Sequence, residues 1–202
     1  VAPLPLNLHD PSAITVWEKQ LYVADRGALL KVDLESHEVT EMFTGFACGI
    51  TNLMAHEGIL YINCSKDRRV QPLRAVDLSS GVLFEIPFHT APACPWSGLA
   101  VVRGCLVVAG ERALWAVRLK SIRDSFEAQG SGPQQTLPML ASTAAWLQDH
   151  DILVTAIASD GEVLYIADAT DSVVLHTPLP DLEHAVCSER VFPAGDAWSQ
   201  CS

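Results

Sequence analysis

The fold is decided by one short segment that recurs four times: LYVAD at 21–25, LYINC at 60–64, LVVAG at 106–110 and LYIAD at 164–168. Such density of aliphatic, β-branched and aromatic residues favours a strand. Seven residues before each leucine stands an aliphatic residue, namely Ile14, Leu53, Leu99 or Ile157. Two residues earlier again stands Ser12, Thr51, Ser97 or Thr155. Four equal spacings indicate an internal repeat.

Each copy continues with two more strand-like segments. The third is Leu29–Leu34, Leu73–Leu78, Leu114–Leu119 or Val174–Leu179. Pro178 in the last copy lacks a backbone donor and belongs near a strand end. Fourth strands are expected at Val39–Phe43, Val82–Pro87, Thr136–Leu140 and Ala185–Phe192. Gly58, Gly104, Gly161 and Gly81 provide the residues that tight turns between these strands require.

Each unit is therefore a four-stranded antiparallel meander, and its anchors recur after 39, 46 and 58 residues. One such sheet cannot bury two apolar faces, whereas radially packed neighbours bury them. A β-sandwich would not explain the in-register repetition, and a β-solenoid would repeat at a shorter, more even period. We predict an all-β chain forming a single β-propeller domain over 1–202, with blades at about 12–47, 48–93, 94–148 and 152–193.

The longest interval contains the one irregular region. Residues 121–129 predict a short helix with Ile122 and Phe126 on one face, ended by Gly130. The stretch from Gly130 to Gln135 is typical of a flexible loop.

The end of the chain resembles the approach to the third unit, because Trp198-Ser199 matches Trp96-Ser97. Residues 194–202 would then begin a further blade. A terminal blade without a neighbour exposes an apolar face and an unpaired edge. Val1–Leu8 could complete a four-bladed ring, further residues could lie outside this chain, or another protein could cover the open face. We favour an incomplete or partner-capped propeller.

The strands LYVAD and LYIAD, and the stretch from Asp160 to Asp168, resemble NHL-type repeats. The resemblance covers all four units, most closely the first and the fourth. It implies the propeller architecture and no particular activity. The polar and basic residues that usually follow the Asp are degraded here, as in Arg26-Gly27, and the third copy lacks the Asp.

The resemblance also extends to gluconolactonase and lyase propellers, which bind a divalent cation through side chains from several blades. Asp25, Asn63 and Asp168 stand at comparable strand ends and are the weak candidates for such a metal site. A carboxylate there more commonly accepts backbone N–H groups of a turn. We therefore expect no catalytic residue, no cofactor and no metal site. A second polar cluster, Asp149-His150-Asp151, precedes a strand at a loop, where polar residues are expected anyway.

The six cysteines form no C-x-x-C pair, so a zinc site is not expected. Cys64 and Cys105 lie in strands and are predicted to be buried thiols. Cys48 and Cys94 occupy neighbouring units, beyond the reach of a disulfide, and we predict that they do not bond to each other.

The charge and composition of the chain limit the classes of partner that it can bind. The formal net charge is −11, which argues against nucleic acid. The basic run Lys66–Arg69 is interrupted by an acid and predicts a solvated hairpin turn. No apolar run is long enough to cross a membrane. Val1 is not Met, and Val1–Leu8 lacks the pattern of a signal peptide, so we expect a processed chain or a part of a longer one. The sequence does not indicate the cellular compartment of the protein.

Function follows mainly from architecture. The leading hypothesis is a non-enzymatic protein-interaction scaffold, within a larger assembly, that binds a protein partner. One alternative is a metal-dependent lactonase- or lyase-like hydrolase, which metal analysis would reveal. Another is an extracellular ligand-binding or adhesion domain, which paired cysteines would favour.

Overall fold

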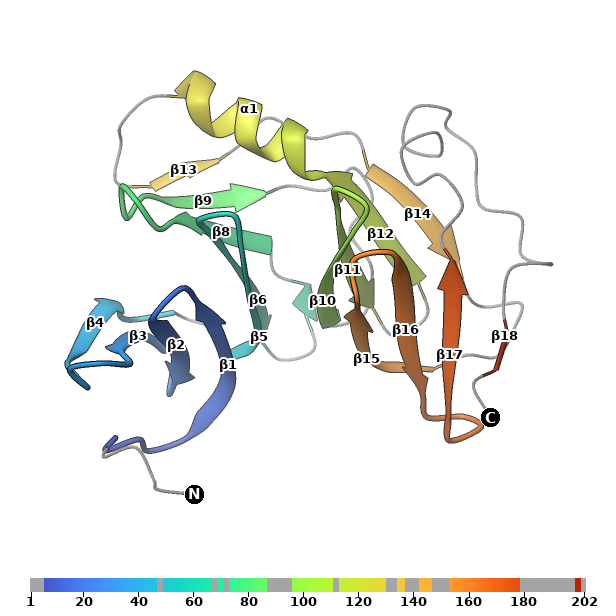
Figure 1. Ribbon diagram of the computed structural model, residues 1–202, viewed down its shortest axis with the longest axis horizontal. Coiled ribbons are helices and arrows are strands. Elements are labelled where there is room, and N and C mark those ends of the chain that lie inside the picture. Colours follow the sequence, from blue (N-terminus) through green and yellow to red (C-terminus); the bar gives the residue numbers. More distant parts are fainter. Residues whose placement is uncertain are drawn as a thin grey trace.

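The protein is an all-β propeller fold of four blades that follow one another around an arc (Figure 1). The computed structural model describes residues 6–46, 49–66, 69–70, 73–86, 96–110, 113–129, 134–136, 142–146, 153–178 and 199–200. Blade 1 contains β1 (Pro11–Trp17), β2 (Gln20–Asp25), β3 (Ala28–Asp33) and β4 (Val39–Phe43). Blade 2 contains β5 (Gly49–His56), β6 (Ile59–Lys66), β8 (Leu73–Asp77) and β9 (Leu83–Ile86). Blade 3 contains β10 (Trp96–Val102), β11 (Cys105–Gly110), β12 (Ala113–Arg118) and β14 (Ser142–Trp146). Blade 4 contains β15 (Val154–Ser159), β16 (Val163–Asp168), β17 (Val173–Pro178) and β18 (Ser199–Gln200).

The repeat anchors occupy equivalent positions on the innermost strands, as the spacing predicts. Each anchor pairs with the third residue of the recurring segment: Ile14 with Val23, Leu53 with Ile62, Leu99 with Val108, and Ile157 with Ile166. The seven-residue spacing is the length of a hairpin with a two-residue turn. The alignment of the four units is therefore confirmed.

A β-bulge interrupts every innermost strand at the hydroxyl residue. The pairing register shifts between Pro11 and Ala13 in blade 1, and at the equivalent place in the other three blades. The extra residue is Ser12, Thr51, Ser97 or Thr155. In blades 2 and 4 its hydroxyl donates to an equivalent carbonyl, Thr51 Oγ1 to Asn63 O at 3.4 Å and Thr155 Oγ1 to Ala167 O at 3.2 Å. Bulges bend and twist a strand, so the repeated Ser or Thr marks a repeated bend.

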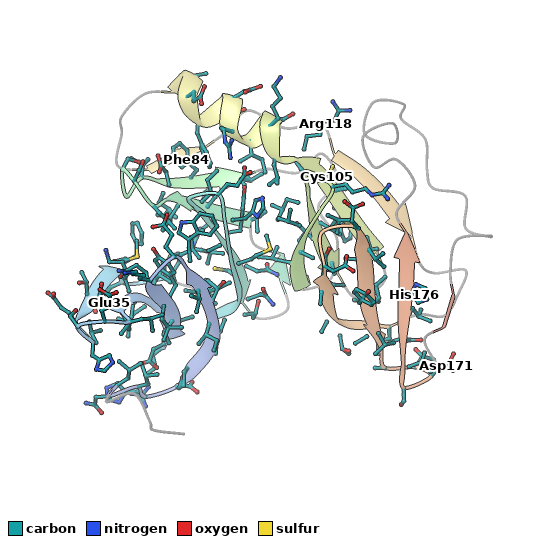
Figure 2. All side chains as sticks on the ribbon, viewed as in Figure 1. Glu35, Phe84, Cys105, Arg118, Asp171 and His176 are labelled. Atoms are coloured by element: carbon teal, nitrogen blue, oxygen red, sulfur yellow. The ribbon has the colours of Figure 1, made fainter. Side chains whose placement is uncertain are left out.

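Apolar layers fill the space between successive blades (Figure 2). Tyr22 and Leu29 of blade 1 pack with Leu53 and Leu60 of blade 2. Blades 2 and 3 meet through a layer that includes Tyr61, Phe84, Leu99 and Trp115. Blades 3 and 4 meet through Val107, Leu114, Leu164 and Ile166. Each sheet thus buries its apolar faces against its neighbours rather than within itself.

The arc is open. Innermost strands of successive blades lie against one another, β1 against β5, β5 against β10 and β10 against β15. The described strands of blades 1 and 4 have no comparable contact, and Figure 1 shows them at opposite ends of the arc. In blade 1, Leu6 and Leu8 pack against Leu21, Val23 and Val32 of the same blade. The described part of Val1–Leu8 therefore covers blade 1 and does not complete blade 4.

The structure between the anchors Leu99 and Ile157 differs in part from the prediction. The predicted helix is confirmed as α1 (Leu119–Gln129), with Ile122 fully buried and the Phe126 ring 4.0 Å from that of Phe84, centroid to centroid. The fourth strand of blade 3 is β14, so the expected strand at Thr136–Leu140 was placed too early.

The loop predicted at Gly130–Gln135 is also partly wrong. Within it begins β13 (Gln134–Thr136), which pairs in parallel with β9 at the outer edge of blade 2. An edge strand needs only backbone N–H and C=O groups for pairing, so this segment carries no apolar pattern.

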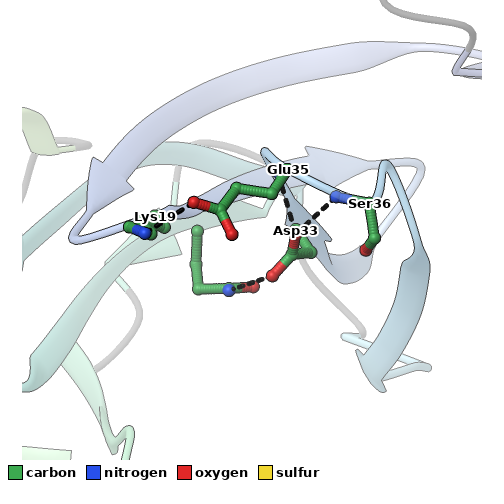
Figure 3. Close-up of polar contacts among 5 residues, drawn as sticks. Lys19, Asp33, Glu35 and Ser36 are labelled. Carbon is green, nitrogen blue, oxygen red and sulfur yellow. Dashed lines mark hydrogen bonds and ion pairs between the residues drawn. The ribbon is translucent and has the colours of Figure 1, made fainter.

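The turns agree with the glycine pattern. Gly58, Gly104, Gly161 and Gly81 all have positive φ, between 71° and 101°. In blade 1 the Asp33 carboxylate accepts the N–H groups of Glu35 and Ser36, at 2.9 and 2.8 Å, and the amide of Gln20 (Figure 3). These bonds lower the pKa of Asp33, the Ser36 bond most. Asp77 holds the equivalent turn of blade 2 through Ser79 and Ser80.

At the C-terminal end, the two described residues of the predicted further blade, Ser199–Gln200, pair with β17 as the fourth strand of blade 4. The expected strand at Ala185–Phe192 lies outside the described residues, and the division into blades over the whole chain stays a prediction. Cys64 and Cys105 are buried thiols rather than half-cystines, as expected. Cys48 and Cys94 lie outside the described residues.

Candidate functional site

Asp25 and Asp168 hold the start of their own innermost strands. The Asp25 carboxylate accepts the N–H of Asp10 at 2.6 Å and that of His9 at 3.0 Å. The Asp168 carboxylate accepts the N–H of Leu153 and of Thr170, each at 2.9 Å. Asp10 and Leu153 are equivalent, four residues before the anchors. Both aspartates therefore perform the same structural task in different blades.

The backbone bonds set the charge of these aspartates. The bond from Asp10, followed by that from His9, lowers the pKa of Asp25 below its ordinary value of 3.8. Burial alone would raise the pKa of Asp168, but the bonds from Leu153 and Thr170 outweigh it and the net shift is downward. Both side chains are thus anions whose oxygen atoms face backbone donors.

Asn63 occupies the neighbouring position of blade 2 and behaves differently. Its side chain is completely buried, and neither its amide nitrogen nor its amide oxygen has a hydrogen-bond partner in the part of the chain that the structure describes. The equivalent residues are Ala24, Ala109 and Ala167. Since buried polar groups are usually paired, Asn63 is an energetic exception among the four blades.

The three metal candidates lie in the second strands of three different blades. Asp25, Asn63 and Asp168 lie on blades 1, 2 and 4, and the bonds described above are made with backbone of the same blade. Across the described residues, no group of three His, Cys, Asp or Glu side chains is placed to hold a metal ion. Asp149-His150-Asp151 lies outside them. Lys66 pairs with Arg69, so the two ends of the basic run pair as the predicted hairpin requires.

Blade 1 has an open face, whose residues the sequence pattern did not identify. We call the face of a blade toward the preceding blade its back face, and the other its forward face. Ile14 and Val16, on the back face of β1, are 65% and 52% exposed. The anchors equivalent to Ile14 in blades 2 and 3, Leu53 and Leu99, are 6% exposed. The aligned anchors already indicated this face, because the repeat places Ile14 at the position where Leu53 and Leu99 meet the blade before them.

The forward face of blade 4 is the complementary open surface. Tyr165 lies there between Ala158 and His176 in neighbouring strands. Its counterparts Tyr22 and Tyr61 are 3% and 1% exposed because the next blade covers them. By contrast, Tyr165 is partly exposed, and its hydroxyl donates to the carboxylate of Asp160 at 3.2 Å.

The closed interfaces show how a forward face meets a back face. Between blades 1 and 2, the Ser12 hydroxyl donates to Ile50 O at 2.6 Å, and Ala55 N–H donates to Thr15 Oγ1 at 3.3 Å. Between blades 3 and 4 the innermost strands also approach closely. A Cβ on Gly98 would stand 2.8 Å from Ile157 Cγ1. At the junction of blades 3 and 4, a small residue on the forward face thus receives the bulky anchor of the following back face.

Comparisons with known proteins identify the fold and no family. No protein-family model matches the chain, and no curated protein matches it. The computationally designed Ika4 protein is similar in structure, with a TM-score of 0.59 at 12% identity over 88% of this chain and 96% of that one. Virginiamycin B lyase from Staphylococcus aureus has a TM-score of 0.59 at 12% identity, over 84% of this chain and 53% of the lyase.

A chain of a nidogen/laminin complex is similar to the same degree, with a TM-score of 0.59 at 13% identity. The match covers 86% of this chain and 61% of that chain. The chain therefore spans nearly all of the designed protein but only about half of the lyase. Identities this low show the propeller fold alone. No helix in the described part of the chain is long and apolar enough to cross a membrane.

Proposed function

We propose that this chain is a non-enzymatic interaction module that binds a protein through the back face of blade 1. The observation that carries the proposal is the exposure of Ile14, at a position that is buried in the next two blades, together with that of Val16 two residues further along β1. Exposed apolar side chains that adjoin one another on one face of a sheet are typical of protein–protein contact surfaces.

Charge supports a protein partner over nucleic acid. The chain carries 24 acidic against 13 basic residues, and binding to phosphates depends on clustered cations. The similar solved structures include both a lyase and a protein complex, so the fold is compatible with either kind of function. The proposal therefore rests on the open face and not on the likeness.

The alternatives depend on other groups. A metal-dependent hydrolase would draw on Asp25 and Asp168, whose carboxylates already accept backbone N–H groups. Metal analysis of the purified protein tests that alternative directly. An extracellular adhesion domain would depend on disulfides, which a thiol count with and without reductant measures.

The test of the proposal compares two charged variants in affinity capture from the native source. Ile14→Asp places a carboxylate on the open back face of blade 1. Thr40→Asp places the same group on the forward face of the same blade, at the exposed outermost strand β4 beside Lys31. We expect a specific protein to be retained by the wild type and by Thr40→Asp and to be lost with Ile14→Asp. Equal capture by all three would contradict the proposal.

A further inference from the structure

We propose that the partner of the blade 1 back face is the forward face of blade 4 of a second copy, so that two arcs close one eight-bladed ring. This inference rests on the proposed function and names its partner. It would place Ile14 and Val16 of each copy against β15 of the other.

The two open faces are the two halves of an interface that the chain already makes three times. Back faces of blades 2, 3 and 4 each receive the forward face of the blade before them. Within the described parts of the chain, the forward face of blade 4 and the innermost strand of the blade 1 back face lack this cover, whereas Leu6 and Leu8 cover the outer strands of the blade 1 back face. Because the repeat aligns in register, the same packing can continue from one copy to the next.

The sizes of the residues match at this junction. Forward faces present two residues of the innermost strand, one on each side of the anchor. In blade 3 these are Gly98 and Ala100, which lie against Ile157. In blade 4 they are Ala156 and Ala158, both exposed, and the side chain to be received is again an isoleucine, Ile14. Two small residues facing an isoleucine would repeat the arrangement between blades 3 and 4.

The outer parts of the two faces are compatible as well. Tyr165 stands where Tyr22 and Tyr61 are buried by the following blade. Val174, 47% exposed on the same face, pairs with Ala167 in the neighbouring strand. On the receiving side, Leu6 and Leu8 of the same chain pack over Leu21 and Val23, so the open part of this face is formed by Ile14 and Val16 on β1. Apolar side chains are therefore exposed on both faces.

The number of copies follows from the number of blades. Head-to-tail contacts make a ring if the rotation closes and a filament if it does not. Propellers typically have about four to eight blades. Two four-bladed arcs reach the upper end of that range, whereas three arcs exceed it. We therefore infer a two-fold ring with two identical junctions.

The mass of the 202-residue chain in solution tests the inference. Sedimentation velocity is run over a concentration series at or above physiological ionic strength, where repulsion between chains of net charge −11 is screened. We expect a species of twice the 21.9 kDa chain mass. Ile14→Asp and Ala158→Asp should each raise the dimer dissociation constant by about tenfold or more, and Thr40→Asp should not. Circular dichroism verifies that all three variants are folded.

Mixing the two single variants tests the head-to-tail geometry. An Ile14→Asp chain keeps a wild-type forward face, and an Ala158→Asp chain keeps a wild-type back face. Each alone should be monomeric, but their mixture should form a heterodimer through the one intact junction. If two back faces packed on each other instead, Ala158→Asp would stay dimeric alone and the mixture would gain nothing. That result would overturn the inference.

The same experiments separate the inference from the proposed function. A wild-type chain that stays monomeric overturns the inference. If Ile14→Asp still loses a captured protein of another kind, the interaction module survives with a different partner. If neither self-association nor capture responds to Ile14→Asp, the inference and the proposed function both fail.

Discussion

At the scale of single residues, one carboxylate fixes the place where an innermost strand begins. Asp25 and Asp168 each accept two backbone N–H groups, one of them from the segment leading into the strand. A charged acceptor forms stronger hydrogen bonds than a neutral one. The stability of blades 1 and 4 should therefore depend on the ionisation of these side chains.

Asp25→Asn and Asp168→Asn should each lower the free energy of unfolding at pH 7. Because folding lowers both pKa values, the stabilisation is present above the ordinary value of 3.8 and is lost as the pH falls through the folded-state pKa. Urea denaturation at pH 7 and pH 3 measures this. The loss between the two pH values should be smaller in either variant than in the wild type.

An exposed helix residue provides the control, since Asp124→Asn in α1 removes a carboxylate from the surface. It should leave both the stability at pH 7 and its acid dependence nearly unchanged. If Asp25→Asn and Asp168→Asn behave like Asp124→Asn, the two carboxylates do not hold the strands.

Asn63→Ala should leave the protein as stable as the wild type or raise the free energy of unfolding by up to about 1 kcal/mol. Each unpaired buried polar group costs about 1–3 kcal/mol, and a small cavity offsets part of the gain. Alanine is the residue at this position in the other three blades. Urea denaturation measures the change, with Asn52→Ala on the neighbouring strand β5 as control. A loss above about 1 kcal/mol would show that the amide has a hydrogen-bonding partner in solution.

Part of this residue-level description was predictable. The recurring strand placed Asp25, Asn63 and Asp168 at comparable positions, and the chemistry of a carboxylate beside a turn predicted the capping bonds. The lack of partners around Asn63 depends on how blade 3 packs against blade 2, which a repeat pattern does not contain. The β-bulge in each innermost strand could not be predicted either, because a serine or threonine indicates a register shift only when the pairing with the neighbouring strand is known.

At the scale of strands and helices, the distance between two innermost strands is set by the smallest residue between them. Gly98 on β10 faces Ile157 on β15, and a Cβ there would stand 2.8 Å from Ile157 Cγ1 and 3.1 Å from Ile157 N. Equivalent positions carry Ala13, Asn52 and Ala156. Glycine is thus required by the close junction of blades 3 and 4 and not by the repeat itself.

Gly98→Ala should lower the free energy of unfolding by about 1–3 kcal/mol, because an added methyl group forces packed strands apart. Ile157→Ala removes the Cγ1 atom that the new methyl group would meet. In that background Gly98→Ala should cost less, and a double-mutant cycle of urea denaturation curves measures the difference. Strictly additive costs would show that the two residues do not meet.

The elements were predictable where side chains determine them. The strands of the meander and α1 were found because apolar residues recur with the period of their structure. Strand β13 was missed because pairing with β9 uses backbone groups alone. The same miss displaced the expected fourth strand of blade 3 from β14.

At the scale of the whole molecule, the described strands of blades 2 and 3 contact a blade on both sides, whereas those of blades 1 and 4 contact one blade each. The stability of a repeat array is approximately a sum of unit and nearest-neighbour terms. The ends of the arc should therefore open more readily than its middle. This expectation can be tested on equivalent strands, which differ in their neighbours and not in their position within the repeat.

Hydrogen exchange followed by mass spectrometry should show slower exchange in β6 and β11 than in β2 and β16. Local opening of a terminal blade needs to break only one junction. Dimerisation through the open faces should slow exchange in β2 and β16 as the protein concentration rises. Equal rates in all four strands at low concentration would mean that the arc unfolds only as a whole.

Strand β13 has a consequence for the order in which the ribosome delivers the parts of this protein. Blade 2 receives its outermost strand from residues that emerge only after three strands of blade 3 and α1 have been synthesised. Until Gln134–Thr136 leave the exit tunnel, β9 offers an unpaired edge to any nascent chain nearby. The sheet of blade 2 is therefore completed late in translation. Until then, a chaperone or a neighbouring polypeptide can bind the unpaired edge of β9.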